Sequence, residues 1–90
     1  MADIKDTLTE RGTKYGNYKD QTRISRSLMD EMQTTQVWDS LETDQEDALM
    51  MIAVKISRIL NGDPNYADNW HDIAGYATLV ADRLDGNERK

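Results

Sequence analysis

Apolar residues recur at helical spacing in three stretches of the chain, and no stretch alternates apolar and polar residues as a surface strand would. In the first stretch, Ile24, Leu28 and Met32 follow one another every four residues, which is typical of an amphipathic helix with a narrow apolar stripe. The pattern therefore predicts an all-α fold. The predicted helices span about residues 18–34, 43–61 and 66–84.

Start and stop signals flank the central predicted helix, residues 43–61. Thr43 and Glu46 have the spacing of a capping box, in which each side chain satisfies a backbone amide of the other residue. Gly62 predicts a left-handed stop, and Pro64 prevents the helix from resuming. Because the next helix starts almost at once, we expect the two helices to form an antiparallel hairpin.

The whole chain, residues 1–90, is predicted to form a single helical domain. Residues 1–17 form a polar N-terminal segment with several turn formers, and residues 87–90 form a frayed polar tail. In the connector before the hairpin, the apolar side chains are expected to dock on the core. These are Val37, Trp38 and Leu41.

The central helix is apolar on nearly all sides, since Met50, Met51 and Val54 lie off its main stripe. A helix of this kind is buried on more than one side. A chain of 90 residues has a marginal core of its own. We therefore expect a small helical bundle that is completed by homo-oligomerisation.

Composition narrows the class of protein. Seventeen carboxylates against eleven Lys and Arg give a net charge of −6, which argues against binding of duplex nucleic acid. The absence of cysteine excludes disulfides. No apolar run approaches the roughly 18 residues of a membrane span, and the N-terminus lacks a signal pattern. A cytoplasmic protein without a membrane partner is the expectation.

Charged residues converge where the predicted hairpin turns. With the turn at Asp63-Pro64, the residue numbers of facing pairs add up to about 127, so Lys55 faces Asp72 and Arg58 sits near Asp68. The two aspartates are four residues apart and share one helix face. One interpretation is a structural ion-pair network that fixes the register of the hairpin.

The other interpretation of these four side chains is a polar pocket. The cations would bind phosphate oxygens, Asp68 and Asp72 would hold a magnesium ion, and a tyrosine would stack on a base. The candidate tyrosines are Tyr15, Tyr18 and Tyr76. Residue types alone favour the ion-pair network. His71 is interpreted as a surface or subunit-contact imidazole.

Three motifs carry a resemblance to a known family. They are Glu10-Arg11-Gly12 with Tyr15-Gly16, then Lys55-Ile56-x-Arg58-Ile59-Leu60-x-Gly62, and then Asp68-x-Trp70-x-Asp72-Ile73-Ala74-Gly75-Tyr76. The chain resembles short phage and prophage helical proteins of the nucleotide-modification-associated type, which are distantly similar to MazG-like all-α nucleotide pyrophosphohydrolases. The resemblance implies an oligomerising helical bundle. It also implies a ligand-binding site drawn from Arg11, Tyr15, Lys55, Arg58, Asp68, Asp72 and Tyr76.

The chain departs from the MazG-like pattern in its acidic residues. MazG-like enzymes hold Mg²⁺ with E-E-x-x-E on one helix and E-x-x-D on the next. Here Lys55 stands where a carboxylate would be wanted, and Asp68 and Asp72 form D-x-x-x-D. A protein with one half-site cannot clamp both sides of an in-line displacement. The residues therefore fit ligand binding better than turnover.

Three functions remain open from the sequence. The first is a phage-type protein of the host cytosol that binds a nucleotide or nucleotide-like phosphate ligand, in nucleotide metabolism or in sequestration of a host defence signal. The second is a reduced MazG-like enzyme, a Mg-dependent nucleoside triphosphate pyrophosphohydrolase. The third is a protein-binding inhibitor of a host enzyme, without a small-molecule ligand.

Overall fold

Helices account for most of residues 4–87, the part of the chain that the computed structural model describes. The α-helices are α1 (Ile4–Tyr15), α2 (Tyr18–Met32), α3 (Thr43–Asn61) and α4 (Ala67–Leu84), and the 3₁₀ helix η1 (Gln36–Ser40) joins α2 to α3. No strand occurs among the described residues, so the all-α prediction is confirmed. Within residues 4–87, no helix is long and apolar enough to cross a lipid bilayer.

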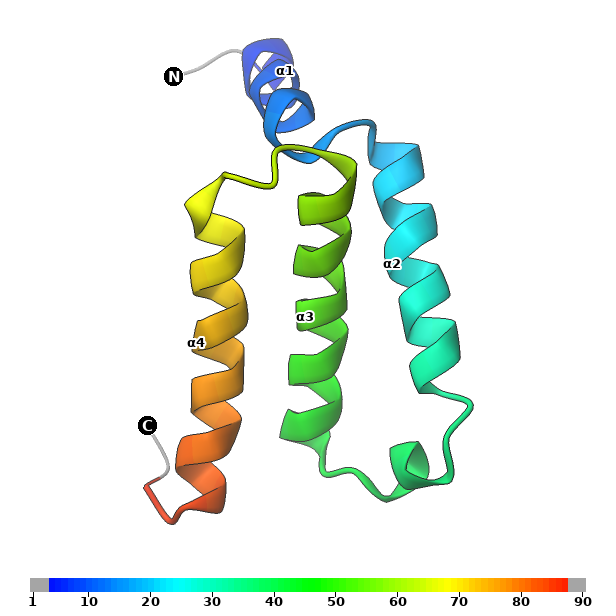
Figure 1. Cartoon of the computed structure of the whole chain (residues 1–90), viewed down its shortest axis with the longest axis vertical. Helices are drawn as coiled ribbons and strands as arrows, with labels where there is room; N and C mark the ends of the chain where they lie inside the picture. The colour runs from blue at the N-terminus through cyan, green and yellow to red at the C-terminus, as the bar shows by residue number, and fades with distance from the viewer. Residues whose placement is uncertain (1–3, 88–90) are drawn as a thin grey trace.

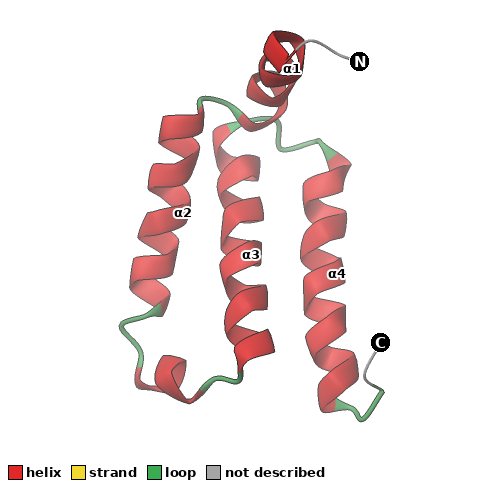
Figure 2. Ribbon diagram, turned by 180° about the vertical axis from the view of Figure 1, so that it is seen from behind, coloured by secondary structure: helices red, strands yellow, loops and turns green. Residues whose placement is uncertain are grey.

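The three long helices lie side by side in one layer. Figures 1 and 2 show α3 in the middle, with α2 on one side and α4 on the other, and α1 across one end. Helix α3 packs on both neighbours, whereas α2 and α4 scarcely meet. Helix α3 is therefore covered on the two sides that face α2 and α4, and the two faces of the layer leave it uncovered.

The predicted helix hairpin is confirmed, with bounds that differ by at most one residue from α3 and α4. The predicted capping box is shifted by one position. Glu42, rather than Thr43, is the N-cap, and its amide donates to Oε1 of Gln45 at 2.9 Å. Glu42 and Gln45 have the same three-residue spacing, but glutamate is not a usual N-cap residue, so the sequence pattern favoured Thr43 and Glu46.

Gly62 ends α3 for a different reason than predicted. Its φ is −132°, so the left-handed stop was wrong. A Cβ at Gly62 would instead collide with the carbonyl of Lys14 and the Cα of Tyr15. Gly16, which does have a positive φ of 80°, meets the backbone of Asn61 in the same way. These two glycines let the end of α1 touch the end of α3.

Helix α1 was not predicted within the polar N-terminal segment. Its sequence lacks a buried stripe, and Ile4 and Leu8 are both exposed. The helix is held through its last turn, where the carbonyl of Lys14 accepts from the amide of Asp63 at 2.7 Å. A contact between residues so far apart along the chain leaves no periodic signal in the sequence.

The core between α2 and α3 is small and partly polar. Ser57 is fully buried and accepts a 2.9 Å hydrogen bond from Nε2 of Gln21, which is buried as well. Trp38 of η1 is buried, as predicted, but its neighbour Val37 is exposed. The 3₁₀ turn points these adjacent side chains in different directions, so only one of them can reach the core.

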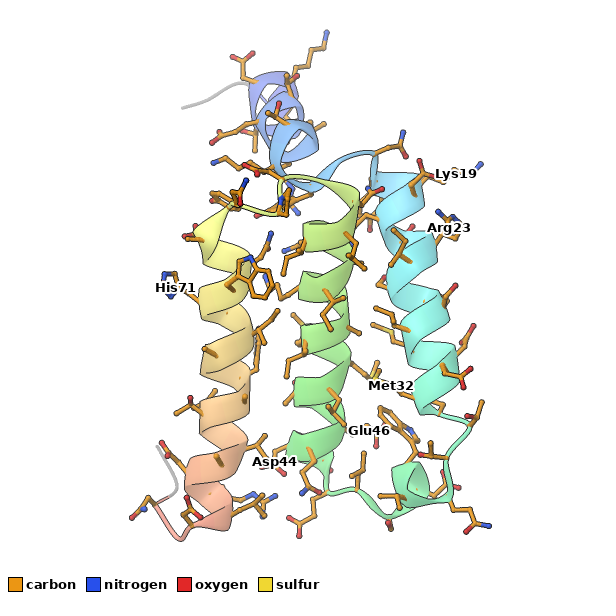
Figure 3. The ribbon with its side chains drawn as sticks, in the orientation of Figure 1. Lys19, Arg23, Met32, Asp44, Glu46 and His71 are labelled. Carbon is orange, nitrogen blue, oxygen red and sulfur yellow. The ribbon has the colours of Figure 1, made fainter. Side chains whose placement is uncertain are left out.

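Most apolar side chains along α4 lie outside the packed seam with α3. Trp70 is 54% exposed and Leu84 is 59% exposed, whereas Asn69 is buried against α3. Tyr76 and Arg83, two and four turns further along the same side of α4, are half-buried. The apolar stripe of α4 is wider than one neighbouring helix can cover, so part of it faces solvent. His71 is exposed and points away from α3, in agreement with a surface imidazole (Figure 3).

Candidate anion-binding site

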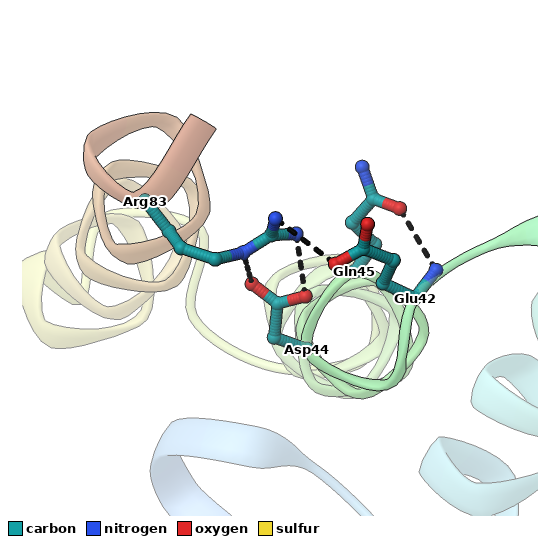
Figure 4. Close-up of polar contacts among 4 residues, drawn as sticks. All are labelled: Glu42, Asp44, Gln45 and Arg83. Atoms are coloured by element: carbon teal, nitrogen blue, oxygen red, sulfur yellow. Dashed lines mark hydrogen bonds and ion pairs between the residues drawn. The ribbon is translucent and has the colours of Figure 1, made fainter. Parts of the chain in front are cut away.

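Two ion pairs fix the register of the α3–α4 hairpin. Nζ of Lys55 lies 3.0 Å from Oδ2 of Asp72, as the turn at Asp63-Pro64 predicted. At the other end of the hairpin, the guanidinium of Arg83 binds both carboxylate oxygens of Asp44, at 2.6 and 2.7 Å (Figure 4). Both pairs have residue numbers that add up to about 127, so the predicted register is confirmed along the hairpin.

The Asp44–Arg83 pair has electrostatic consequences. The hydrogen bond from Arg83 holds the pKa of the Asp44 carboxyl below its ordinary value of 3.8. Arg83 also lies 3.0 Å from a carboxylate oxygen of Glu42, so one guanidinium joins two acids at the start of α3. Sequence reasoning missed this clamp, although the register that placed Lys55 opposite Asp72 also places Asp44 opposite Arg83.

Lys55 is the buried partner of its ion pair with Asp72. The residue is only 9% exposed, whereas the side chain of Asp72 is about half exposed at the rim. Among the described residues, Asp72 is the one acid within ion-pair distance of Lys55. An ammonium has three donors, so Lys55 retains hydrogen-bonding capacity beside its carboxylate.

Arg58 does not pair with Asp68, so this part of the predicted network was wrong. Its guanidinium lies over the ring of Tyr15, with the carbon Cζ 4.5 Å from the ring centroid. Arg11 lies against the same ring at 5.4 Å. Asp68 instead accepts a 2.8 Å hydrogen bond from the hydroxyl of Tyr66. The aromatic ring of an unpredicted helix replaces the carboxylate as the partner of Arg58.

A third cation and a second aromatic ring complete this group. Nζ of Lys14 lies 4.4 Å from the ring centroid of Tyr66, and the two tyrosine rings meet edge to face at 6.1 Å. We call the group the Tyr15 cluster. It consists of Arg11, Lys14, Tyr15, Arg58 and Tyr66.

Hydrogen bonds within and beside the Tyr15 cluster shift two protonation equilibria. The hydrogen bond to Asp68 raises the pKa of the Tyr66 hydroxyl above its ordinary value of 10.0. The hydrogen bond to Glu10, 3.0 Å long, raises the pKa of the Lys14 ammonium above 10.5. At neutral pH the cluster therefore keeps a neutral phenol and a charged amine.

Asn61 positions Tyr15. Its side-chain amide donates to the carbonyl of Tyr15 at 3.0 Å and to the carbonyl of Asn17 at 2.9 Å. Together with the close contact at Gly16 and Gly62, these bonds attach the α1–α2 turn to the end of α3. The ring of Tyr15 is therefore held against Arg58 by backbone contacts from two elements.

Two buried nitrogen donors near the Tyr15 cluster have no acceptor among the described residues. They are Nε of Arg58 and Nδ2 of Asn69, and Asn69 is only 1% exposed. Their residue numbers also add up to about 127, so the register places them opposite each other across the hairpin. A buried donor without a partner costs about 1–3 kcal/mol. Two such donors, with Lys55 one turn away, favour a bound acceptor of negative charge.

A groove between α1 and the start of α2 adjoins the Tyr15 cluster. Its volume is about 620 Å³, within the ordinary range for small-molecule sites, and Arg11, Tyr15 and Tyr18 line it. Gly12 lies in its wall. In a helix interior glycine costs about 1 kcal/mol relative to alanine, and a Cβ at Gly12 would meet nothing in the protein. The missing side chain leaves room for a ligand.

Tyr76 lies elsewhere. It lines a hollow of about 250 Å³ with Asp47 and Arg83, towards the other end of the hairpin. The structure therefore brings Arg11, Tyr15 and Arg58 together, with Lys55 one turn from Arg58 along α3. Tyr76 shares a hollow with Asp72, the partner of Lys55, but does not line the groove beside the Tyr15 cluster.

The donor set fits a magnesium ion poorly. No group of three acidic or histidine side chains that could hold a metal ion occurs among residues 4–87. Of the two predicted ligands, Asp72 faces the ammonium of Lys55 and Asp68 accepts from Tyr66. Each carboxylate is already engaged by a donor, and the ammonium repels a cation.

The sequence matches the family described as Domain of unknown function (DUF6378) over residues 2–84. The chain belongs to the DUF6378 family. In this DUF6378 protein the matched range includes the whole Tyr15 cluster and the hairpin down to Arg83. Neither a curated protein nor a solved structure matches the chain. The functional assignment of this DUF6378 protein therefore rests on the geometry of its site.

Sequence reasoning missed four residues that build the site: Lys14, Asn61, Tyr66 and Asn69. The hairpin register could have found Asn69, since it pairs with Arg58 under the rule that paired Lys55 with Asp72. The other three act through contacts with α1, and no pattern predicted that helix.

Proposed function

We propose that this protein binds a nucleotide or nucleotide-like phosphate compound at the Tyr15 cluster. The observation that carries the proposal is the pair of buried donors, Nε of Arg58 and Nδ2 of Asn69, that face each other without an acceptor. Guanidinium groups bind phosphate through charge-assisted and often bidentate hydrogen bonds. In a chain of net charge −6, these cations supply a local field suited to an anion.

The aromatic part of the cluster suits the base of a nucleotide. Base–aromatic stacking contributes about 1–3 kcal/mol per base, and Tyr18, which is exposed beside the groove, offers a ring face. Arg11 lines the groove, and Arg58 lies against the other groove-lining partner, Tyr15, so a base in the groove would place its phosphates on the side of these cations. Such a cytosolic protein would serve nucleotide metabolism or sequester a nucleotide signal of host defence.

Isothermal titration with nucleoside triphosphates and cyclic dinucleotides tests the proposal. We expect binding to at least one compound by the wild-type protein, and a Kd raised about tenfold or more in Arg58→Gln. Arg23→Gln is the matched control, because Arg23 is exposed and points away from the layer (Figure 3). It should bind like the wild type.

The same samples separate binding from turnover. Release of pyrophosphate from a nucleoside triphosphate with Mg²⁺ or Mn²⁺, lost in Asp72→Asn, would favour the hypothesis of a pyrophosphohydrolase over binding without turnover. Absence of heat with every compound, or equal weakening by the two arginine variants, would contradict the proposed site.

A further inference from the structure

One face of the α3–α4 hairpin carries no charged side chain among the described residues. We call it the uncharged face and define it by Leu49, Ile52 and Leu60 of α3 and Trp70, Ala77 and Leu84 of α4. At 3.6 residues per turn these positions fall on the same side of the layer. An apolar groove of about 360 Å³ runs between the two helices past Leu49, Ile52, Ala77 and Leu84.

Large apolar side chains on this face are open to solvent. Leu60 is 68% exposed, and Trp70 and Leu84 are more than half exposed. A stripe at two of every seven positions is enough for a single coiled-coil seam, whereas a stripe at three of seven is typical of a helix that faces the core of a bundle. Both hairpin helices carry the wider stripe, and their mutual contact covers only part of it.

The solvent-accessible area of the chain is larger than that of a compact monomer of the same mass. It is 6670 Å², whereas a compact monomer of 10.3 kDa exposes about 5,400 Å². The surplus of about 1,300 Å² includes the area of α1, which has no buried residue, and it exceeds the roughly 800 Å² that each partner contributes to a standard interface. The radius of gyration agrees, at 15.1 Å against about 12 Å for a compact domain of this length.

We propose that a second copy of this chain packs on the uncharged face. Stable domains have two layers of secondary structure, and this chain supplies one (Figures 1 and 2). An identical layer provides a matching face, as a two-fold symmetric interface requires. Because the face carries no charge, it can meet its own copy despite the net charge of −6.

Side-chain size on α4 favours close packing of the second copy. Ala74, Ala77 and Ala81 are exposed and small, so a partner helix can approach α4 closely, and Trp70 offers a large anchor at one end. Helical geometry puts Asp68 and Asp72 on the opposite side of α4. The second copy therefore leaves these acidic side chains of the site open.

Sedimentation of the full chain tests this interface. The wild type should sediment at twice the 10.3 kDa chain mass, and its Tm should fall on dilution because dimerisation and folding are coupled. Ala77→Glu should raise the dimer Kd by about 100-fold or more, since it places a charge in an apolar interface. Thr78→Glu is the control, with the same added charge on the next, outward-facing residue.

A second variant, Leu84→Glu, tests the same interface in case Ala77→Glu prevents the chain from folding. Leu84→Glu changes a side chain at the end of α4 that is already exposed in the protomer, and it should also give monomers with retained helix content. A monomeric wild type, or dimers that resist both Ala77→Glu and Leu84→Glu, would overturn the proposal. So would dissociation by Thr78→Glu equal to that by Ala77→Glu.

Discussion

Asn69 is polar, almost completely buried, and without an acceptor for its amide nitrogen in the described structure. An apolar residue of similar volume at this position would make the folded protein more stable, because an unpaired buried donor is costly. Arg58 shares this property at its Nε. Two such donors on facing helices indicate a site whose polar groups are kept for a ligand.

Replacing this side chain should separate stability from binding. Asn69→Leu keeps the volume and removes the unpaired donor, so we expect the free energy of unfolding to rise by about 1 kcal/mol. Nucleotide affinity should fall at the same time. Urea unfolding measures the first effect and calorimetric titration the second. A loss of more than about 1 kcal/mol would show that Asn69 supports the fold rather than a ligand.

Individual contacts were predictable only where both partners lay in predicted helices. The hairpin register gave Lys55 with Asp72, because a short turn fixes which residues face each other. It failed for Arg58 with Asp68, because Arg58 turns to Tyr15 on α1. An arginine exchanges a carboxylate for an aromatic ring at small cost, so spacing alone could not choose between them.

Among the elements, α3 was the most predictable and α1 the least. Apolar residues and end signals delimit α3 within the sequence itself. Helix α1 depends on hydrogen bonds from the side-chain amide of Asn61 and the backbone amide of Asp63 to carbonyls at its C-terminal end, and only the folded chain brings these groups together. The candidate site is built where α1 meets the hairpin, so the sequence showed its α3 and α4 residues and missed the rest.

The hairpin should be sensitive to acid through Asp44. Its pKa is lowered in the folded protein by Arg83, so the ion pair contributes stability above the unfolded pKa of about 4 and loses it as pH falls through the folded value. We expect the Tm of the wild type to fall more steeply than that of Asp44→Asn below about pH 4. Thermal melts from pH 6 to pH 2 measure the difference.

Asp30→Asn is the control for this measurement, since Asp30 is exposed on α2, away from the hairpin. It should follow the wild-type curve. If the Tm of the wild type and of Asp44→Asn changed in parallel across this pH range, the Asp44–Arg83 ion pair would contribute nothing to stability.

At the scale of the whole molecule, the layer has two unlike faces. One carries Asp47, Asp68 and Asp72, and the other is the uncharged face. The sequence indicated that α3 was too apolar for a small chain to bury, and it predicted a bundle completed by other chains. It could not show which part of the α4 stripe would remain exposed, because a stripe three-sevenths wide fits several rotations of the helix.

The central claim is that an anion binds between Arg58 and Asn69, and nuclear magnetic resonance of the side-chain N–H groups tests it most directly. On addition of pyrophosphate or a nucleoside triphosphate, we expect the Nε–H of Arg58 and the Nδ2–H₂ of Asn69 to shift and saturate together. The Nε–H of Arg23, on the outer side of α2, should stay in place (Figure 3). Unmoved signals from Arg58 and Asn69 at saturating ligand, or shifts confined to exposed cations such as Arg23, would contradict the account.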